Sequence, residues 1–486
     1  MERKIGKSDW IFLLLCLLLG IVVEESFFRG EIGISYLVVI LAFYTLFFWR
    51  YRGFTFSHQR FGYLVLICIW LLSVSFFLNN STMLTALNFL VIPGMVVFHL
   101  VLITSQKSMP WNKPVFISYI FSRLIEAIKY NFIFAAILGK VFKSGVDERK
   151  YLVWKKVFIG LLISIPVLFV VLRLLMSADT QFELLIGGIP QWFEVVNAET
   201  VMRIIIVFFY TFAIFGLLQV LFKKQIKAIK QDLNVDSFKM DAIIAITVLV
   251  LINTVYLLFT VVQFKYFFSG TLQGDFTYAE YARKGFFELL FVTLINLSII
   301  IFVLNFVDRI PVFVSKFVQI MLTVLVLVSG VMLCSAFLRL SMYEQAYGFT
   351  FIRIMSHSFM IFLVVIFMYT LVKIWIEKLS LFHFYFISSL LYYTAINIID
   401  LEKIIVTQNI ERYEQSGKID IYHLNNMSYS GVMGLIDLYE KDQSLPGLRG
   451  ILIERKQEAL QDNLPWQSYN LKREQANERL KNLVLE

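Results

Sequence analysis

Charged side chains recur at helical spacing in residues 275–288, just before an apolar stretch. Thr277 and Glu280 have the spacing of a capping box, in which two side chains satisfy free backbone amides at a helix start. Glu280, Lys284 and Glu288 follow one another at intervals of four, which predicts ion pairs along one helix face. Charged groups beside lipid are costly and often functional, so Glu288 is a candidate for a ligand or ion site. An ion-paired helix entrance is the simpler interpretation.

Glu199 and Arg203 form a second candidate pair, because they lie four residues apart where another apolar stretch begins. An interfacial salt bridge would explain both residues. The functional alternative brings them together with Arg283 and Glu288 across a helical bundle. Glu199, Arg203, Arg283 and Glu288 are therefore the candidate polar site, which we expect at the outer face of a membrane.

Isolated polar residues inside apolar stretches are the third group. Asn253, Asn296 and Asn305 are interpreted as hydrogen-bonding groups between helices, and a polar path for a solute is the alternative. His357 has a side chain that titrates near neutral pH and could sense protons, although a hydrogen bond within the bundle is the simpler role. These residues support a transporter less strongly than an acid near the middle of a span would.

The sequence lacks the common motifs for metal binding, nucleotide binding and hydrolysis. The three cysteines and five histidines are scattered, without the spacing of a zinc or CxxC site. The P-loop, GxSxG and HExxH patterns are absent. We therefore predict no cofactor and no metal, and an enzyme is the less favoured class.

The elements that would position these residues are membrane spans. Apolar residues make up 59% of the 486 positions and form about eleven stretches near the length of about 20 residues that crosses a bilayer. The prediction is an all-α, polytopic transmembrane helical bundle. Its expected spans are 9–24, 33–48, 61–78, 83–103, 156–176, 200–222, 241–263, 283–307, 312–338, 353–376 and 380–399.

Residues 113–143 are apolar but carry several charges, including Arg123 and Glu126. Polar side chains on one helical stripe predict an amphipathic helix lying in the membrane interface. If this segment spanned the membrane instead, the orientation of everything after it would invert.

Lysine and arginine collect in alternate loops, and such loops are typically cytoplasmic. The basic segments are the N-terminus, 49–60, 104–155 and 223–240, whereas 24–32 and 79–82 are poor in basic residues. This predicts a membrane protein with a cytoplasmic N-terminus and, after eleven spans, an external C-terminus. The basic excess is explained by this topology and by anionic lipid headgroups, so the bilayer is the expected partner and nucleic acid is not.

The composition changes at Asp400 to that of a small helical module. Residues 400–486 carry 11 Lys and Arg against 14 Asp and Glu, so we divide the chain into a membrane domain, 1–399, and this module. The last span is expected to continue as a helix through Glu414 and to end near Gly417, a favourable C-cap. Pro446 and Pro465 then separate three helices, expected over about 428–442, 447–461 and 468–484.

Two parts of the sequence resemble a known family. Residues 278–289 (YAEYARKGFFEL) resemble the YAEYAR-GFFEL signature of bacterial multipass membrane proteins catalogued as domain of unknown function 4173, which is related to 4153. Residues 409–413 (NIERY) and 417–420 (GKID) are similar to the pattern after that family's last span, and the likeness covers about 200–486. The chain departs from the pattern at 427–432 (MSYSGV), where the family's Asp and Pro are missing. The resemblance implies a bacterial inner membrane and brings no established activity.

The favoured function is a non-enzymatic sensor or accessory component that binds a small ligand, or another envelope or membrane protein, at its outer face. A small-solute transporter using the polar residues within spans is the second hypothesis. The third is a membrane enzyme acting on a lipid or envelope precursor, with Glu288 or Glu199 as acid or base.

Overall fold

The computed structural model describes residues 7–79, 81–143, 198–223, 240–268, 286–307 and 311–485, with a few isolated positions between 153 and 178. In this part of the chain every named element is a helix, which confirms the predicted all-α bundle. The described residues form two compact units. The first contains 1–64, 93–228 and 464–468, and the second contains 65–92, 229–463 and 469–486.

The first unit is held by the packing of its long apolar helices. Gly20 lies against the main chain of Val207, so α1 and α8 approach closely because no side chain separates them. Arg50 pairs with Asp9 at 2.9 Å beside them, and both side chains are largely buried. The helices that contribute to this unit are α1 (Lys7–Phe28), α2 (Ile34–Arg50), part of α3 (Gln59–Leu78), part of α4 (Thr82–Thr104), α5 (Val115–Lys143), α8 (Ala198–Lys223) and the 3₁₀ turn η1 (Trp466–Ser468).

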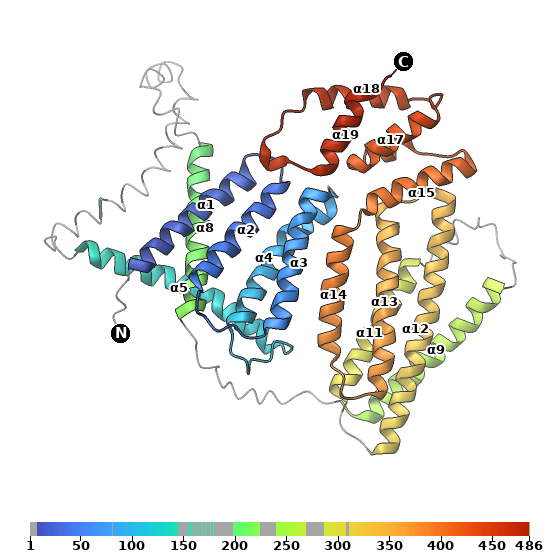
Figure 1. Ribbon diagram of the computed structural model, residues 1–486. Helices are drawn as coiled ribbons and strands as arrows, with labels where there is room; N and C mark the ends of the chain where they lie inside the picture. The colour runs from blue at the N-terminus through green and yellow to red at the C-terminus, as the bar shows by residue number, and fades with distance from the viewer. Residues whose placement is uncertain are drawn as a thin grey trace. The chain divides into compact units, whose positions relative to one another are not determined.

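The second unit combines long helices with the short ones of the C-terminal segment (Figure 1). The longest helix, α12, packs against α9, α11 and α13 around a core of aliphatic side chains. The helices of the second unit, besides the rest of α3 and α4, are α9 (Ala242–Phe268), α11 (Phe286–Phe306), α12 (Val312–Tyr347), α13 (Phe351–Trp375), α14 (Leu381–Ile398), α15 (Leu401–Ser416), α16 (Ile421–Asn425), α17 (Tyr429–Lys441), α18 (Leu448–Gln461) and α19 (Leu471–Asn482).

Nine helices of the described chain are long and apolar enough to cross a bilayer: α1, α3, α4, α8, α9, α11, α12, α13 and α14. The predicted span at 33–48 forms the shorter apolar helix α2, and the one at 156–176 lies largely outside the described residues. Most of the segment 113–143 forms the helix α5, which is not among the nine. That this helix is amphipathic and lies in the membrane interface stays a prediction. The chain is a multipass membrane protein.

The C-terminal helices α17, α18 and α19 form, and α15 ends, within a few residues of the predicted places. The short helix α16 was not predicted. All five helices share an apolar core. Gly417 ends α15 with a φ of 67°, the left-handed conformation that a glycine cap supplies. One expectation is wrong: α14 does not continue into this segment. It ends at Ile398, and Asp400 starts α15 by accepting a hydrogen bond from the amide of Lys403 (Figure 1).

Candidate functional site

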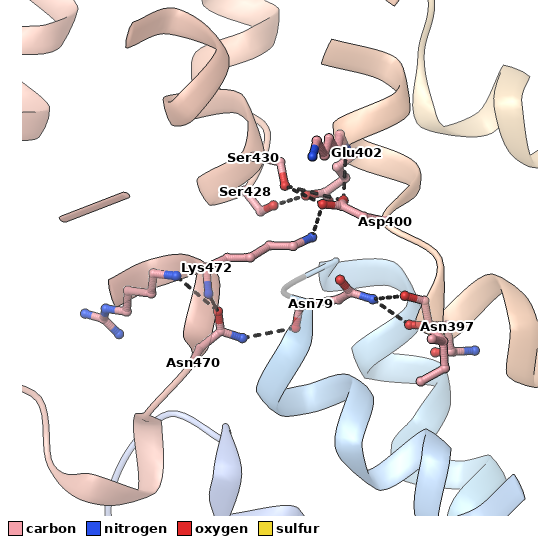
Figure 2. Close-up of polar contacts among 11 residues, drawn as sticks. Asn79, Asn397, Asp400, Glu402, Ser428, Ser430, Asn470 and Lys472 are labelled. Atoms are coloured by element: carbon pink, nitrogen blue, oxygen red, sulfur yellow. Dashed lines mark hydrogen bonds and ion pairs between the residues drawn. The ribbon is translucent and has the colours of Figure 1, made fainter. Parts of the chain in front are cut away.

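Asp400 and Lys472 form a partly buried ion pair at the beginning of α15. The Nζ atom of Lys472 lies 2.5 Å from Oδ2 of Asp400, and the side chains are 12% and 22% exposed. Lys472 comes from the first turn of α19, and the hydroxyl of Ser430, in α17, lies 3.3 Å from the same carboxylate oxygen. Figure 2 shows these side chains converging from three helices. Restricted access to water makes this attraction stronger than that of an exposed pair.

Glu402 lies beside this ion pair, in the first turn of α15. It accepts a hydrogen bond from the Ser428 hydroxyl at the start of α17 (Figure 2). Burial raises the pKa of Glu402 to about 7, and the neighbouring Asp400 adds to the rise, whereas Lys472 and the Ser428 backbone act in the opposite direction. The group therefore changes charge near physiological pH.

Three asparagines connect this ion pair to the ends of the spans. Asn79, directly after α3, donates to the carbonyl of Asn397 at 2.6 Å and so satisfies the end of α14. Asn470 caps α19 by accepting from the amides of Lys472 and Arg473, and donates to the carbonyl of Phe76 at 3.0 Å. These contacts attach α19 to α3 and α3 to α14. We refer to Asp400, Glu402, Ser428, Ser430, Lys472, Asn79 and Asn470 as the Asp400 junction.

The cavity at the Asp400 junction is small. It offers about 10 Å³ to a water-sized sphere and is lined partly by Asn79, Asp400, Glu402 and Lys472. That volume is about the minimum for one water molecule and far below that of a substrate. The arrangement is suited to holding helices together through ionisable groups, and it is too tight to bind a reactant.

The middle of α15 is attached to the turn between α12 and α13. Asn409 both accepts from the amide of Phe349 and donates to its carbonyl, each at 2.9 Å. The guanidinium of Arg412 donates to the carbonyls of Gln345 and Ala346 at 2.9 and 2.8 Å. Asn409 and Arg412, two of the residues that carry the family resemblance, thus bind α15 to the end of α12. Gly348 allows this approach, because a Cβ there would lie 2.8 Å from the Asn409 amide oxygen.

Glu199 and Arg203, from the predicted polar site, lie in the first unit. Arg203 donates to Glu199 at 2.5 Å and pairs with Glu24 of α1 at 3.3 Å. Glu24 is 3% exposed, so the pair joins α8 to α1 through a buried carboxylate that the sequence did not single out. Next to it, Glu25 accepts from the side-chain amide of Gln467 at 2.9 Å.

Glu288 and Arg283 are the other two predicted site residues. Glu288 is exposed in the first turn of α11, within the second unit. Arg283 lies outside the described residues. The four-residue site at the outer face therefore stays a prediction.

His357 is not isolated. Its Nε2 atom lies 3.1 Å from a carboxylate oxygen of Glu344, which is 4% exposed, and Phe337 packs edge-on against the imidazole. Within the spans, Asn296 donates to Ser329 at 2.9 Å and Asn253 to the carbonyl of Met321 at 3.0 Å. These amides therefore bond between helices.

The residues that the structure describes contain no group of three or more His, Cys, Asp or Glu side chains that could hold a metal ion. The sequence reasoning missed Asp400, Glu402 and Lys472. One signal was available, because Asp400 follows an apolar stretch directly and aspartate is a strong N-cap.

The fold and the junction define a polytopic α-helical membrane protein whose C-terminal helices are attached to the ends of its spans. The chain belongs to the family described as Domain of unknown function (DUF4153), which it matches over residues 66–438. The more specific resemblance to domain of unknown function 4173 is not part of that match. No curated protein and no solved structure matches the chain.

Proposed function

We propose that this protein is a non-enzymatic membrane sensor or accessory component, in which α15 couples the C-terminal helices to the spans. One observation carries the proposal: α15 is bonded to both parts of the molecule that it would couple. Asn409 and Arg412 bond it to the end of α12. Glu402 and Asp400 bond it to α17 and α19. A displacement of α17 or α19 by a ligand or partner would therefore alter contacts at the ends of the spans.

The signal would arrive at the outer face of a bacterial inner membrane, as the charge of the loops predicts. It would be a small ligand or another envelope or membrane protein that contacts α16 to α19. The Asp400 junction favours this role over catalysis because Lys472 pairs with Asp400 and Glu402 bonds to Ser428, around about 10 Å³ of space.

A transporter receives less support. One cavity of about 520 Å³ is lined by α9 and α11 and another of about 330 Å³ by α12 and α13, and neither lining contains Asn253, Asn296 or Asn305. The asparagines in these spans serve as hydrogen-bonding groups between or within helices.

The test is complementation of a strain from which the gene has been deleted. A screen of envelope stresses first identifies a condition in which that strain does not grow. Asp400→Lys and Lys472→Asp should each fail to restore growth. The double exchange should restore it in part, because it re-forms the ion pair but not the N-cap that Asp400 supplies to α15. Glu414 and Lys441 supply a matched control, because they also approach to 2.5 Å but are 52% and 59% exposed. Reversing that exposed pair should leave growth unchanged, since such pairs contribute about 1 kcal/mol or less.

Membrane levels of each variant are measured by immunoblot. Loss of growth at normal levels for the single variants, with rescue by the double exchange, supports coupling through this pair. Glu199→Gln and Glu288→Gln should complement fully. Loss of growth in either, with normal activity of the Asp400 and Lys472 variants, would instead favour an enzyme with an acid or base at those glutamates.

A further inference from the structure

A polar cavity of about 720 Å³ lies in the first unit. It is lined by residues of 54–57, Gln59, 104–107 and Tyr119, and therefore lies where α2 ends, α3 begins and α4 ends. The amide of Ser57 donates to the carbonyl of Ile103 at 2.8 Å and fastens the two sides together. The volume of the cavity is within the range of small-molecule sites.

The chain around this cavity is basic throughout. Residues 51–60 and 104–117 contain no Asp or Glu. They contain Arg52, Arg60, Lys107 and Lys113, all of which are exposed. An acid-free set of cations of this kind gives the cavity a positive potential and attracts anions.

Lys107 and Tyr119 are two hydrogen-bond donors of the lining that are suited to an anion. The hydroxyls of Ser57, Thr104 and Ser105 donate to main-chain carbonyls of α4, so their hydrogens are already used. Lys107 is exposed in the lining and presents an ammonium group.

The hydroxyl of Tyr119 is oriented by a buried arginine. Arg123, which is 2% exposed, donates to the Tyr119 oxygen at 2.7 Å and lies 4.6 Å from the centre of its ring. Because that oxygen already accepts a hydrogen bond, its own hydrogen is directed elsewhere, and the cavity lies beside it. Glu126, at 3.0 Å, holds the guanidinium in place.

We propose that this cavity binds the phosphate headgroup of an anionic phospholipid, with Lys107 and Tyr119 as donors to the phosphate. α3 and α4 are candidate spans, so their ends lie at the depth of lipid headgroups. Phe54 and Phe56 also line the cavity and offer apolar surface to the glycerol and the first acyl carbons. A lipid headgroup therefore fits this position better than a free phosphate ion.

The experiment titrates the full-length protein, in a non-ionic detergent at fixed ionic strength, with dihexanoyl phosphatidylglycerol. The same concentrations of dihexanoyl phosphatidylcholine and of inorganic phosphate are the comparisons. Native mass spectrometry measures the retained lipid and thermal unfolding measures the stabilisation. The wild-type protein should retain phosphatidylglycerol in preference to phosphatidylcholine, and inorganic phosphate alone should stabilise it little.

Lys107→Gln should weaken the binding of phosphatidylglycerol by about tenfold, because it removes one hydrogen bond to a charged group. Lys113→Gln is the matched control: it removes the same charge from the same acid-free segment, but outside the cavity lining, and should weaken binding clearly less. Tyr119→Phe keeps the ring beneath Arg123 but removes the hydroxyl, which is both the donor to the phosphate and the acceptor of the Arg123 hydrogen bond. It should therefore weaken the binding of phosphatidylglycerol and also lower the unfolding temperature without lipid.

Equal losses for Lys107→Gln and Lys113→Gln would reduce the effect to general surface charge and overturn the proposal. Equal retention of phosphatidylglycerol and phosphatidylcholine would overturn it as well. Stabilisation by inorganic phosphate that matches that by phosphatidylglycerol would overturn the lipid headgroup as the ligand and assign the cavity to a free phosphate.

Discussion

At the residue scale, burial distinguishes ion pairs that have the same length. Lys472–Asp400 and Lys441–Glu414 are both 2.5 Å apart, but the first pair is mostly buried and the second is more than half exposed. Water and salt screen the exposed pair, so it contributes little, whereas removing one partner of the buried pair leaves a charge with poor solvation. Attachment of α19 to α15 therefore depends on Lys472.

Glu402 makes the stability of the C-terminal helices depend on pH. Its pKa is raised from 4.5 to about 7 in the folded protein, so the folded state holds a proton that the unfolded state releases between these values. The stabilisation is complete below pH 4.5 and is lost as pH rises through 7. Between pH 6 and pH 8 the loss amounts to about 1 kcal/mol.

We therefore expect Glu402→Gln to remove part of the pH dependence. The wild-type unfolding temperature in detergent should fall from pH 6 to pH 8, and that of Glu402→Gln should fall less. Glu411→Gln, an exposed acid of the same helix, is the control and should behave like the wild type. Identical pH profiles for wild type and Glu402→Gln would show that this carboxyl does not titrate in that range.

The residues of the Asp400 junction were hard to predict because they come from distant parts of the sequence. The pairing of Glu199 with Arg203 follows from their spacing of four. Lys472 and Asp400 are 72 residues apart, and only the packing of α15, α17 and α19 brings them together. Glu24, on α1, is likewise joined to Arg203 by the packing of α1 against α8.

At the scale of elements, local signals predicted where most C-terminal helices end. Gly417 ends α15 and the segments around Pro446 and Pro465 separate α17, α18 and α19, because neither residue type continues a helix well. The break between α14 and α15 has no glycine or proline. The apolar residues Ile398, Ile399 and Leu401 surround Asp400, so the pattern predicted a continuous helix, and the capping by Asp400 replaced it.

The close contact between α17 and α15 depends on Gly434. A Cβ atom at this position would lie 2.1 Å from the Cγ1 atom of Val406, so Gly434→Ala must move the helices apart. We expect a destabilisation of about 1–3 kcal/mol, the usual cost of overpacking. Gly450→Ala in α18 is the matched control: its Cβ would meet nothing within 4 Å, and alanine should stabilise the helix by about 0.5–1 kcal/mol.

Both values can be read from thermal or denaturant unfolding of the protein in detergent, monitored by circular dichroism. A Gly434→Ala variant as stable as the wild type would mean that α17 does not pack on α15 at this distance.

At the scale of the whole molecule, the helical bundle could be predicted because a membrane span is recognised in a sequence by its length and apolar content alone. Nine described helices meet both criteria. The orientation in the membrane rests on the basic loops, and cysteine labelling tests it.

With the three native cysteines replaced, single cysteines at Gln443 and Ser122, both exposed, are treated in intact cells with an impermeant maleimide. We expect labelling at Gln443 in intact cells and at Ser122 only after lysis. Protection of Gln443 until lysis would place the C-terminal helices in the cytoplasm and require a cytoplasmic partner for the proposed sensor.

The separation of α14 from α15 also affects how the protein responds to bilayer thickness. A span adapts to a thicker or thinner bilayer by changing its tilt. A continuous helix would transmit such a tilt to the C-terminal helices as a rigid lever. Here the chain turns at Ile399, and α15 is attached instead through the side chains of Asp400, Asn409 and Arg412. A tilt of the last span therefore reaches the C-terminal helices through side-chain contacts, including those of Asn79 and Asn470, and not along a continuous helix.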